Sequence, residues 1–179
     1  PRLSLAGVVI AVVVLLALGW GIWQWRKPRP YEPVPEARDW YSKGLDALRN
    51  GSFVQATKAF QQAISVDEKF ALAHARLAES FFELDYAERA KDEMLRVRQL
   101  TPNQSQLART DSLLITAVDS IVTRKSPAAI EAYNQLLAEN AGDPQLYVDL
   151  GRAYEKNDEI KKAIESYVEA TNRNPGDAT

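Results

Sequence analysis

The chain of 179 residues has no cysteine and a single histidine, His74. The lack of cysteine excludes disulfide frameworks, thiolate metal sites and cysteine nucleophiles. A lone histidine without a carboxylate at ligand spacing makes a poor metal or acid–base site, so we expect His74 to be a packing residue. The sequence also lacks a glycine-rich phosphate loop, a nucleophile elbow and paired carboxylates in an apolar setting. These absences predict a protein that is not an enzyme and that uses no cofactor and no metal.

Clustered basic charge is missing as well. Residues 37–179 contain 18 Lys and Arg against 22 Asp and Glu, and both signs are spread along the segment. A nucleic-acid surface needs concentrated positive charge, so no nucleic-acid partner is expected. The charged side chains are instead typical of solvated helix faces.

One long apolar run stands at the start of the sequence. Residues 3–25 contain only two polar side chains, and as a helix they would span roughly 35 Å. The run ends in three tryptophans followed by Arg26 and Lys27, the order that a lipid–water interface favours. A cleaved signal peptide would have a shorter apolar core and small residues at its end. The run therefore predicts one transmembrane helix and a single-pass membrane protein that contacts the lipid bilayer.

Neither the orientation nor the oligomeric state follows from this run. The chain begins at Pro1, so only Arg2 is visible before the helix, and the side of the membrane on which the rest lies stays open. Small residues four apart, Gly7 with Ala11 and Ala17 with Gly21, would allow two such helices to pack as a homodimer. Residues 26–36 are basic and rich in proline, which predicts a stiff, extended juxtamembrane linker.

A repeating pattern fills residues 37–177. Apolar residues fall three and four apart, as in amphipathic helices, and the alternation typical of strands is absent. A set of small and large side chains recurs at a period of 34 residues, which indicates stacked helix pairs. Its four copies are Gly44, Ala56, Phe60, Ala63; Ala78, Ala90, Met94, Val97; Ala117, Ala129, Tyr133, Leu136; and Gly151, Ala163, Tyr167, Ala170.

The predicted repeats are 37–70, 71–104, 110–143 and 144–177, with an insertion at 105–109. We expect the insertion to lengthen the first helix of the third repeat by more than one turn. Ser52 with Gln55, and Asp85 with Glu88, have the spacing of capping boxes at the second helices of repeats one and two. Ser126 and Asp143 each precede a proline, as capping residues often do.

The repeated residues, with Tyr147, Leu150, Tyr154 and Pro175 in the last copy, resemble the tetratricopeptide repeat. The resemblance implies an all-α fold, a right-handed superhelical array of four helix pairs that follows the single transmembrane helix. In that family the first helix of each repeat lines a groove that binds peptides or partner helices. The matching positions are Arg38, Tyr41, Leu45, Arg49, Leu72, Glu79, Phe82, Glu83, Gln145, Val148, Arg152 and Lys156.

Two of these positions stand out. Tyr41 and Phe82 would be aromatic side chains on an exposed inner face with no core to fill, and aromatic residues make good binding anchors.

Three functions remain open. The first is a membrane-tethered scaffold that binds a protein or peptide in the groove. The second is the sensory or regulatory region of a larger signalling protein whose effector domain precedes residue 1. For this, residues 70–79 and 149–155 resemble repeats in bacterial receptor-type serine/threonine kinases and membrane-bound winged-helix regulators. The third is an accessory subunit of a translocation or secretion complex.

Overall fold

The computed structural model describes residues 20, 31–103 and 107–173. The chain separates into two compact units, 1–31 and 32–179. The predicted membrane helix at 3–25, apart from Trp20, lies outside the described residues, as does the start of the predicted linker. Over the described residues, no helix combines the length and the apolar character that crossing a bilayer requires.

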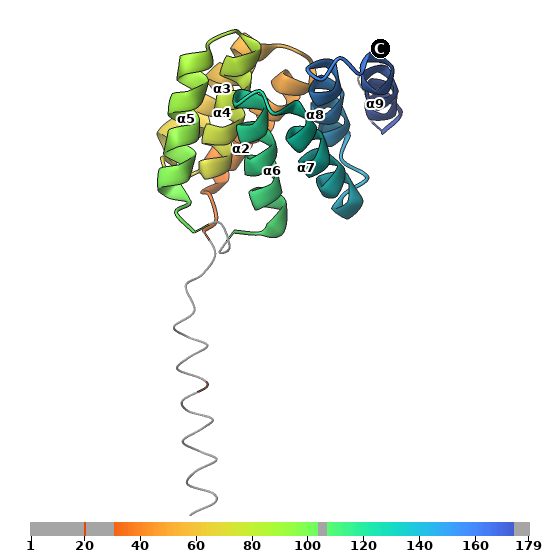
Figure 1. Cartoon of the computed structure of the whole chain (residues 1–179). Helices are drawn as coiled ribbons and strands as arrows, with labels where there is room; N and C mark the ends of the chain where they lie inside the picture. Colours follow the sequence, from red (N-terminus) through yellow and green to blue (C-terminus); the bar gives the residue numbers. More distant parts are fainter. Residues whose placement is uncertain (1–19, 21–30, 104–106, 174–179) are drawn as a thin grey trace, which may run out of the picture. The chain divides into compact units, whose positions relative to one another are not determined.

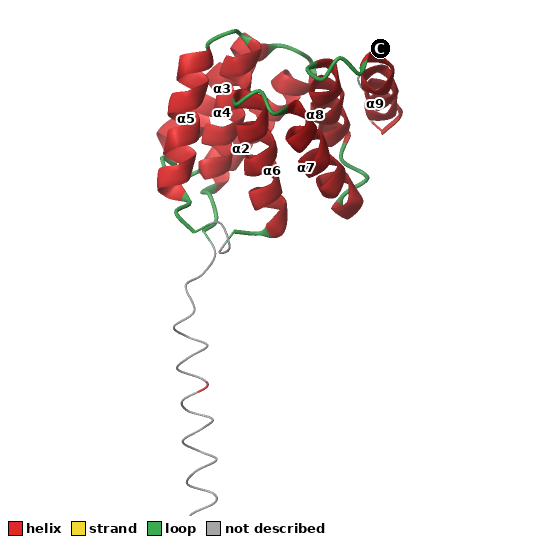
Figure 2. Ribbon diagram, viewed as in Figure 1, coloured by secondary structure: helices red, strands yellow, loops and turns green. Residues whose placement is uncertain are grey.

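In the described part of the second unit, every regular element is a helix (Figures 1 and 2). Eight helices form four antiparallel pairs, and successive pairs stack on one another. The all-α class is therefore confirmed for this part of the chain. The helices are α2 (Pro35–Arg49) and α3 (Phe53–Val66), α4 (Ala71–Glu83) and α5 (Ala87–Leu100), α6 (Arg109–Val122) and α7 (Ser126–Glu139), and α8 (Pro144–Glu155) and α9 (Ile160–Arg173).

The turn inside each pair has one recurring geometry. A residue with positive φ stands two positions before the second helix of every pair, at Gly51, Asp85, Arg124 and Asp158. The next residue donates its backbone N–H to a carbonyl five residues back, as in Ser52 to Ala47 at 2.8 Å and Glu159 to Tyr154 at 2.9 Å. This pair of features defines a helix end of the Schellman type, which satisfies carbonyls that the helix itself leaves without donors.

Most of the predicted side-chain caps are wrong. Neither Ser52 nor Asp85 forms a capping box, and Ser126 is the first residue of α7 rather than its cap. The Schellman turns already fix the chain at these points, and they place Asp85 in the left-handed region instead of at a cap. Only the cap at Asp143 is confirmed, where a carboxylate oxygen accepts from the Gln145 backbone N–H at 2.9 Å.

The predicted lengthening of the third repeat's first helix is also wrong. Helix α6 begins at Arg109 and has 14 residues, like α3 and α5. Ala108 has extended backbone angles, and Leu107 packs against the main core, the cluster of buried apolar side chains that helices α2 to α8 contribute. The contact of the partly buried Leu107 side chain with this core, made outside a helix, explains why the end of the insertion forms a connection rather than an extra turn.

Close contact between helices depends on small residues facing rings. A Cβ atom added to Gly151 on α8 would lie 2.4 Å from Cε1 of Tyr167 on α9. Gly44 on α2 faces Phe60 on α3 in the same way and at the same distance. The missing side chains therefore let each ring lie directly on the backbone of the partner helix, which is how the recurring pattern specifies the pairing.

We predict that Gly151→Leu destabilises the array. The new side chain must push Tyr167 and helix α9 away, and overpacking of this kind typically costs about 1–3 kcal/mol. Chemical denaturation of the variant would measure the loss. Gly142→Leu is the matched control, because its nearest atom is the Asn140 Oδ1 atom at 3.8 Å. Equal stabilities for the two variants would contradict the proposed packing.

Candidate functional site

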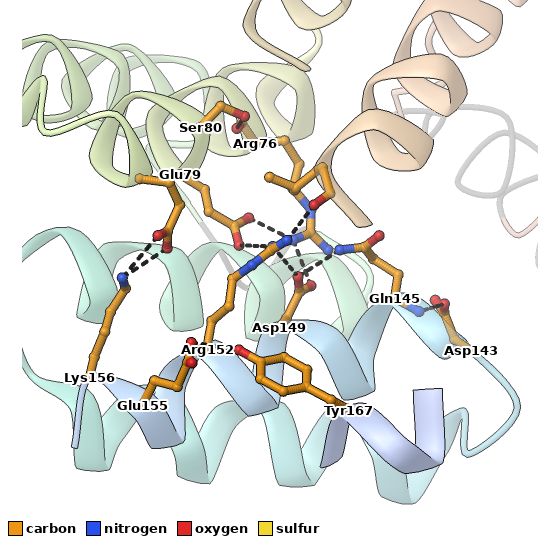
Figure 3. A network of polar contacts seen from close by, with 12 residues as sticks. Arg76, Glu79, Ser80, Asp143, Gln145, Asp149, Arg152, Glu155, Lys156 and Tyr167 are labelled. Carbon is orange, nitrogen blue, oxygen red and sulfur yellow. Dashed lines mark hydrogen bonds and ion pairs between the residues drawn. The ribbon is translucent and has the colours of Figure 1, made fainter. Parts of the chain in front are cut away.

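The inner face of the array holds a buried ionic network (Figure 3). Arg76 on α4 donates from Nη1 to Oδ2 of Asp149 on α8 at 2.6 Å, and to Oε2 of Glu79 at 2.7 Å. These three residues are 1–3% exposed. The ion pair thus joins the first helix of the second pair to the first helix of the fourth, 73 residues apart.

Helix α8 supplies two further members of this network. Gln145 donates from Nε2 to Oδ1 of Asp149 at 2.7 Å. Arg152 donates from Nη2 to the backbone carbonyl of Leu48, near the end of α2, so the network also reaches the first pair. Nη1 of Arg152 lies 3.6 Å from Asp149 and 3.8 Å from Glu79.

Two guanidinium groups and two carboxylates make the network neutral overall. Burial, and then the nearby Asp149 carboxylate, raise the pKa of Glu79 to about 7 against the lowering effect of Arg76 and Arg152. Burial also raises the pKa of Tyr133 on α7, whose hydroxyl has no hydrogen-bond partner in the described part of the chain. The inner face is therefore desolvated, and its charges are balanced by one another rather than by water.

This network occupies much of the predicted groove. Glu79, Gln145, Val148 and Arg152 were expected on an open concave face but are buried. Glu83 is half-buried and pairs with Lys156 at 3.0 Å. The expectation of an open groove fails here because long charged side chains of α4 and α8 meet across it and exclude water.

The two aromatic residues also differ from the expectation. Tyr41 is half-buried between rings, with its centroid 5.6 Å from that of Phe60 and 4.9 Å from that of Phe70. Phe82 packs against the main core, and Lys156 Nζ lies 5.3 Å from its ring centroid. Both aromatic side chains therefore have hydrophobic packing partners. Of the other candidates, Leu45 and Leu72 also pack against the core, whereas Arg38 is exposed.

A pocket of about 550 Å³ remains open between the first and fourth pairs. Four of the twelve predicted groove positions line it: Arg49, Glu83, Val148 and Arg152. The rest of its wall consists of Asn50, Gly51, Phe53, Glu155, Tyr167, Ala170 and Thr171. The wall thus combines apolar surface with guanidinium, carboxylate and amide groups, as binding sites usually do.

Two pocket residues are held in place by their own contacts. Tyr167 donates its hydroxyl hydrogen to Oε2 of Glu155 at 2.6 Å. The Arg152 guanidinium carbon lies 5.2 Å from the centroid of the Phe53 ring. Such fixed side chains reduce the entropy lost when a ligand binds.

His74 is buried, as predicted for a packing residue. Its Nδ1 atom lies 2.6 Å from Oε2 of Glu93 on α5, a partner that the sequence did not reveal because it is 19 residues away. The contact ties together the two helices of the second pair.

The sequence reasoning missed Arg76 and Asp149. The sequence analysis interprets charged residues outside the groove positions as solvated faces, and it finds no paired carboxylates in an apolar setting. A usable signal was present, because each of the two interrupts a run of small or apolar residues, at 71–78 and 146–151. When two apolar runs of the same array contain one residue of opposite charge each, the two charges are better interpreted as a buried ion pair than as part of a solvated surface.

Comparisons with known proteins agree with this geometry. Residues 35–105 and 125–179 match two family models, each described as tetratricopeptide repeat. The chain therefore contains tetratricopeptide repeats over both segments. A search of curated protein sequences gave no match.

Solved structures resemble the chain distantly. MamA from Desulfovibrio magneticus RS-1, residues 41 to the end, is 20% identical, with 80% of this chain and 78% of that chain covered and a TM-score of 0.41. YrrB, described as a TPR protein with an unusual peptide-binding site, is 15% identical, with 79% and 70% covered and a TM-score of 0.36. These similarities are too low to transfer any role to the chain.

We predict a pH-dependent stability that depends on Glu79. Because its pKa is higher in the folded chain, the folded state binds a proton that the unfolded state has lost between pH 4.5 and 7. The contribution of Glu79 to the free energy of unfolding is fully present below pH 4.5 and is lost as the pH rises through about 7. The total loss is on the order of 3 kcal/mol.

Urea denaturation at pH 5 and pH 8 measures this effect. Glu79→Gln, which imitates the protonated form, should show a much smaller fall in unfolding free energy between the two pH values than the unsubstituted chain. The matched control is Glu88→Gln, because Glu88 lies on an exposed face, where it pairs with Lys91. An unchanged pH dependence in Glu79→Gln would contradict the assignment.

Proposed function

We propose that the chain is a non-catalytic scaffold, tethered to a membrane by residues 3–25, that binds a short segment of another protein in the pocket between the first and fourth helix pairs. The observation that carries this proposal is the pocket itself, since it remains open while the Arg76–Asp149 network fills much of the predicted groove.

The size of the pocket limits the ligand. A volume of about 550 Å³ is in the range of sites for small ligands. It fits a few side chains of an extended peptide but not a whole partner helix. We therefore favour a short linear segment over the partner helix that an open groove would accept.

The wall chemistry supports a peptide. Phe53, Val148 and Ala170 offer apolar contact for one side chain. Arg49 and Asn50 contribute donors near the mouth, and Glu155 contributes a carboxylate acceptor. A peptide backbone presents both N–H and C=O groups, so a wall with both kinds of partner suits it better than a wall of one charge.

Binding can be tested with a matched pair of variants. Asn50 and Asn140 each follow the last residue of a helix and are exposed, but only Asn50 lines the pocket. Peptides selected from a random library on the full chain would be measured by calorimetry. We predict that Asn50→Trp, which fills the pocket mouth, weakens binding at least tenfold, while Asn140→Trp leaves it unchanged. Peptides that bind both variants equally well would exclude the pocket as the site.

The membrane tether is a separate prediction. We expect the full chain to stay with membranes during alkaline extraction and to float with them in a density gradient. Val13→Arg with Leu15→Arg should release it, because an arginine at the centre of a membrane helix costs about 2.5–3.5 kcal/mol. Complete extraction of the unsubstituted chain would refute the tether.

A reporter fused after Thr179 that is active only outside the cytoplasm distinguishes the scaffold from the sensory or regulatory region of a larger signalling protein. A signal favours the receptor-like alternative, and silence favours a scaffold for cytoplasmic partners.

A further inference from the structure

Arg152 connects the pocket to the buried ionic network. It lines the pocket together with Phe53, and its guanidinium carbon lies 5.2 Å from the centroid of that ring. The same guanidinium lies close to both carboxylates of the network, with Nη1 3.6 Å from Asp149 and 3.8 Å from Glu79. A charge that enters the pocket beside Arg152 therefore also acts on these two carboxylates, across a desolvated region where screening is weak.

The Arg152 guanidinium has unused hydrogen-bond donors. A guanidinium has five N–H groups. Over the residues that the structure describes, its one hydrogen bond runs from Nη2 to the Leu48 carbonyl, and Nη1 is buried without any. Buried donors are normally paired with an acceptor. Unused donors on a guanidinium in a pocket wall therefore favour a ligand that brings an acceptor.

The carboxylates of the pocket wall have other donors. Glu155 accepts from the Tyr167 hydroxyl at 2.6 Å, and Glu83 pairs with Lys156 at 3.0 Å. In the described part of the chain, neither forms an ion pair with Arg152. A carboxylate from the ligand suits Arg152 best, because its two oxygens can accept side by side from one guanidinium.

We propose that the bound segment carries a carboxylate that pairs with Arg152, and that this carboxylate competes with Glu79 for the same guanidinium. The inference rests on the proposed function of the pocket and names the chemistry of its ligand. The carboxylate belongs either to an aspartate or glutamate side chain or to the C-terminus of the segment. In either case it adds one negative charge beside a network of two guanidinium groups and two carboxylates. Protonation of one network carboxylate restores neutrality, so binding draws a proton onto the chain.

Glu79 is the group that takes up this proton. Burial, and then the Asp149 carboxylate, raise its pKa to about 7. Burial also raises the pKa of the two phenols nearby, which keeps them neutral. The charged and titratable groups that face Glu79 are Arg76 on its own helix, Asp149 and Arg152 on α8, Tyr41 on α2 and Tyr133 on α7. A ligand carboxylate stays ionised above about pH 5, so its affinity falls as Glu79 loses its proton with rising pH.

Two peptide libraries test the carboxylate without altering the chain. Both contain acetylated and amidated heptapeptides whose outer positions are random but not acidic, and the central residue is glutamate in one library and glutamine in the other. Peptides enriched on the full chain in detergent would be made in both forms and measured by calorimetry. We expect the glutamate form to bind at least tenfold more tightly. Free-acid versions of the glutamine peptides test a C-terminal carboxylate as the source.

The two possible failures of this experiment have different meanings. If no peptide binds, or if Asn50→Trp binds the peptides as tightly as the unsubstituted chain does, the proposed function is wrong and the inference fails with it. If peptides bind in the pocket but the glutamate, glutamine and free-acid forms bind alike, the proposed function stands and the carboxylate inference is overturned.

Proton uptake tests the competition with Glu79. Calorimetry at pH 8 in HEPES and in Tris, whose ionisation enthalpies differ, gives the number of protons taken up when the carboxylate peptide binds. We expect uptake by the unsubstituted chain and by the control Glu88→Gln, but almost none by Glu79→Gln. The affinity should fall several-fold between pH 6 and pH 8.5 in the unsubstituted chain and change little in Glu79→Gln. Equal uptake in Glu79→Gln and the unsubstituted chain, or no uptake in either, would overturn the competition for Arg152.

Discussion

The ion pair between Arg76 and Asp149 is the contact on which the inner face depends. Each residue lies on the first helix of a pair, and the two pairs are separated by the whole third repeat. An exposed ion pair contributes little to stability, but a buried pair that loses one partner leaves an uncompensated charge, typically at a cost of about 3–5 kcal/mol. The remaining charges and hydrogen bonds of the network are satisfied by Glu79, Gln145 and Arg152. Repeats two and four are therefore held together by buried polar groups whose separation would cost free energy.

This constraint determines where a ligand can bind. Stacking of helix pairs alone specifies the order of the repeats, and the Gly151–Tyr167 and Gly44–Phe60 contacts specify each pair. The network adds a link between non-adjacent repeats and fills much of the predicted groove. The pocket at the ends of α2, α4 and α8 remains open, and Asn50 and Glu155 are its exposed residues there.

The sequence predicted the helix pairs but not how their inner faces meet. Periodic small and large residues such as Ala117 and Tyr133 follow local geometry, so counting detects them. Whether Glu79 is solvated depends on Arg76 and on a helix 73 residues away, which no local pattern contains. Predictions of the caps were wrong for a related reason. The residues with positive φ at Asp85, Arg124 and Asp158 are not glycine, so the sequence did not indicate the turns that they form.

The Arg76–Asp149 network fixes repeat four against repeat two. Spin labels at Lys91→Cys on α5 and Lys162→Cys on α9 would report this distance by double electron–electron resonance, with the labelled chain diluted in unlabelled chain. We predict one narrow distance distribution, which Arg76→Met makes broader and shifts to longer distances. Arg98→Met, which removes only the exposed pair with Asp119, should leave it unchanged. An identical narrow distribution in Arg76→Met would contradict the account.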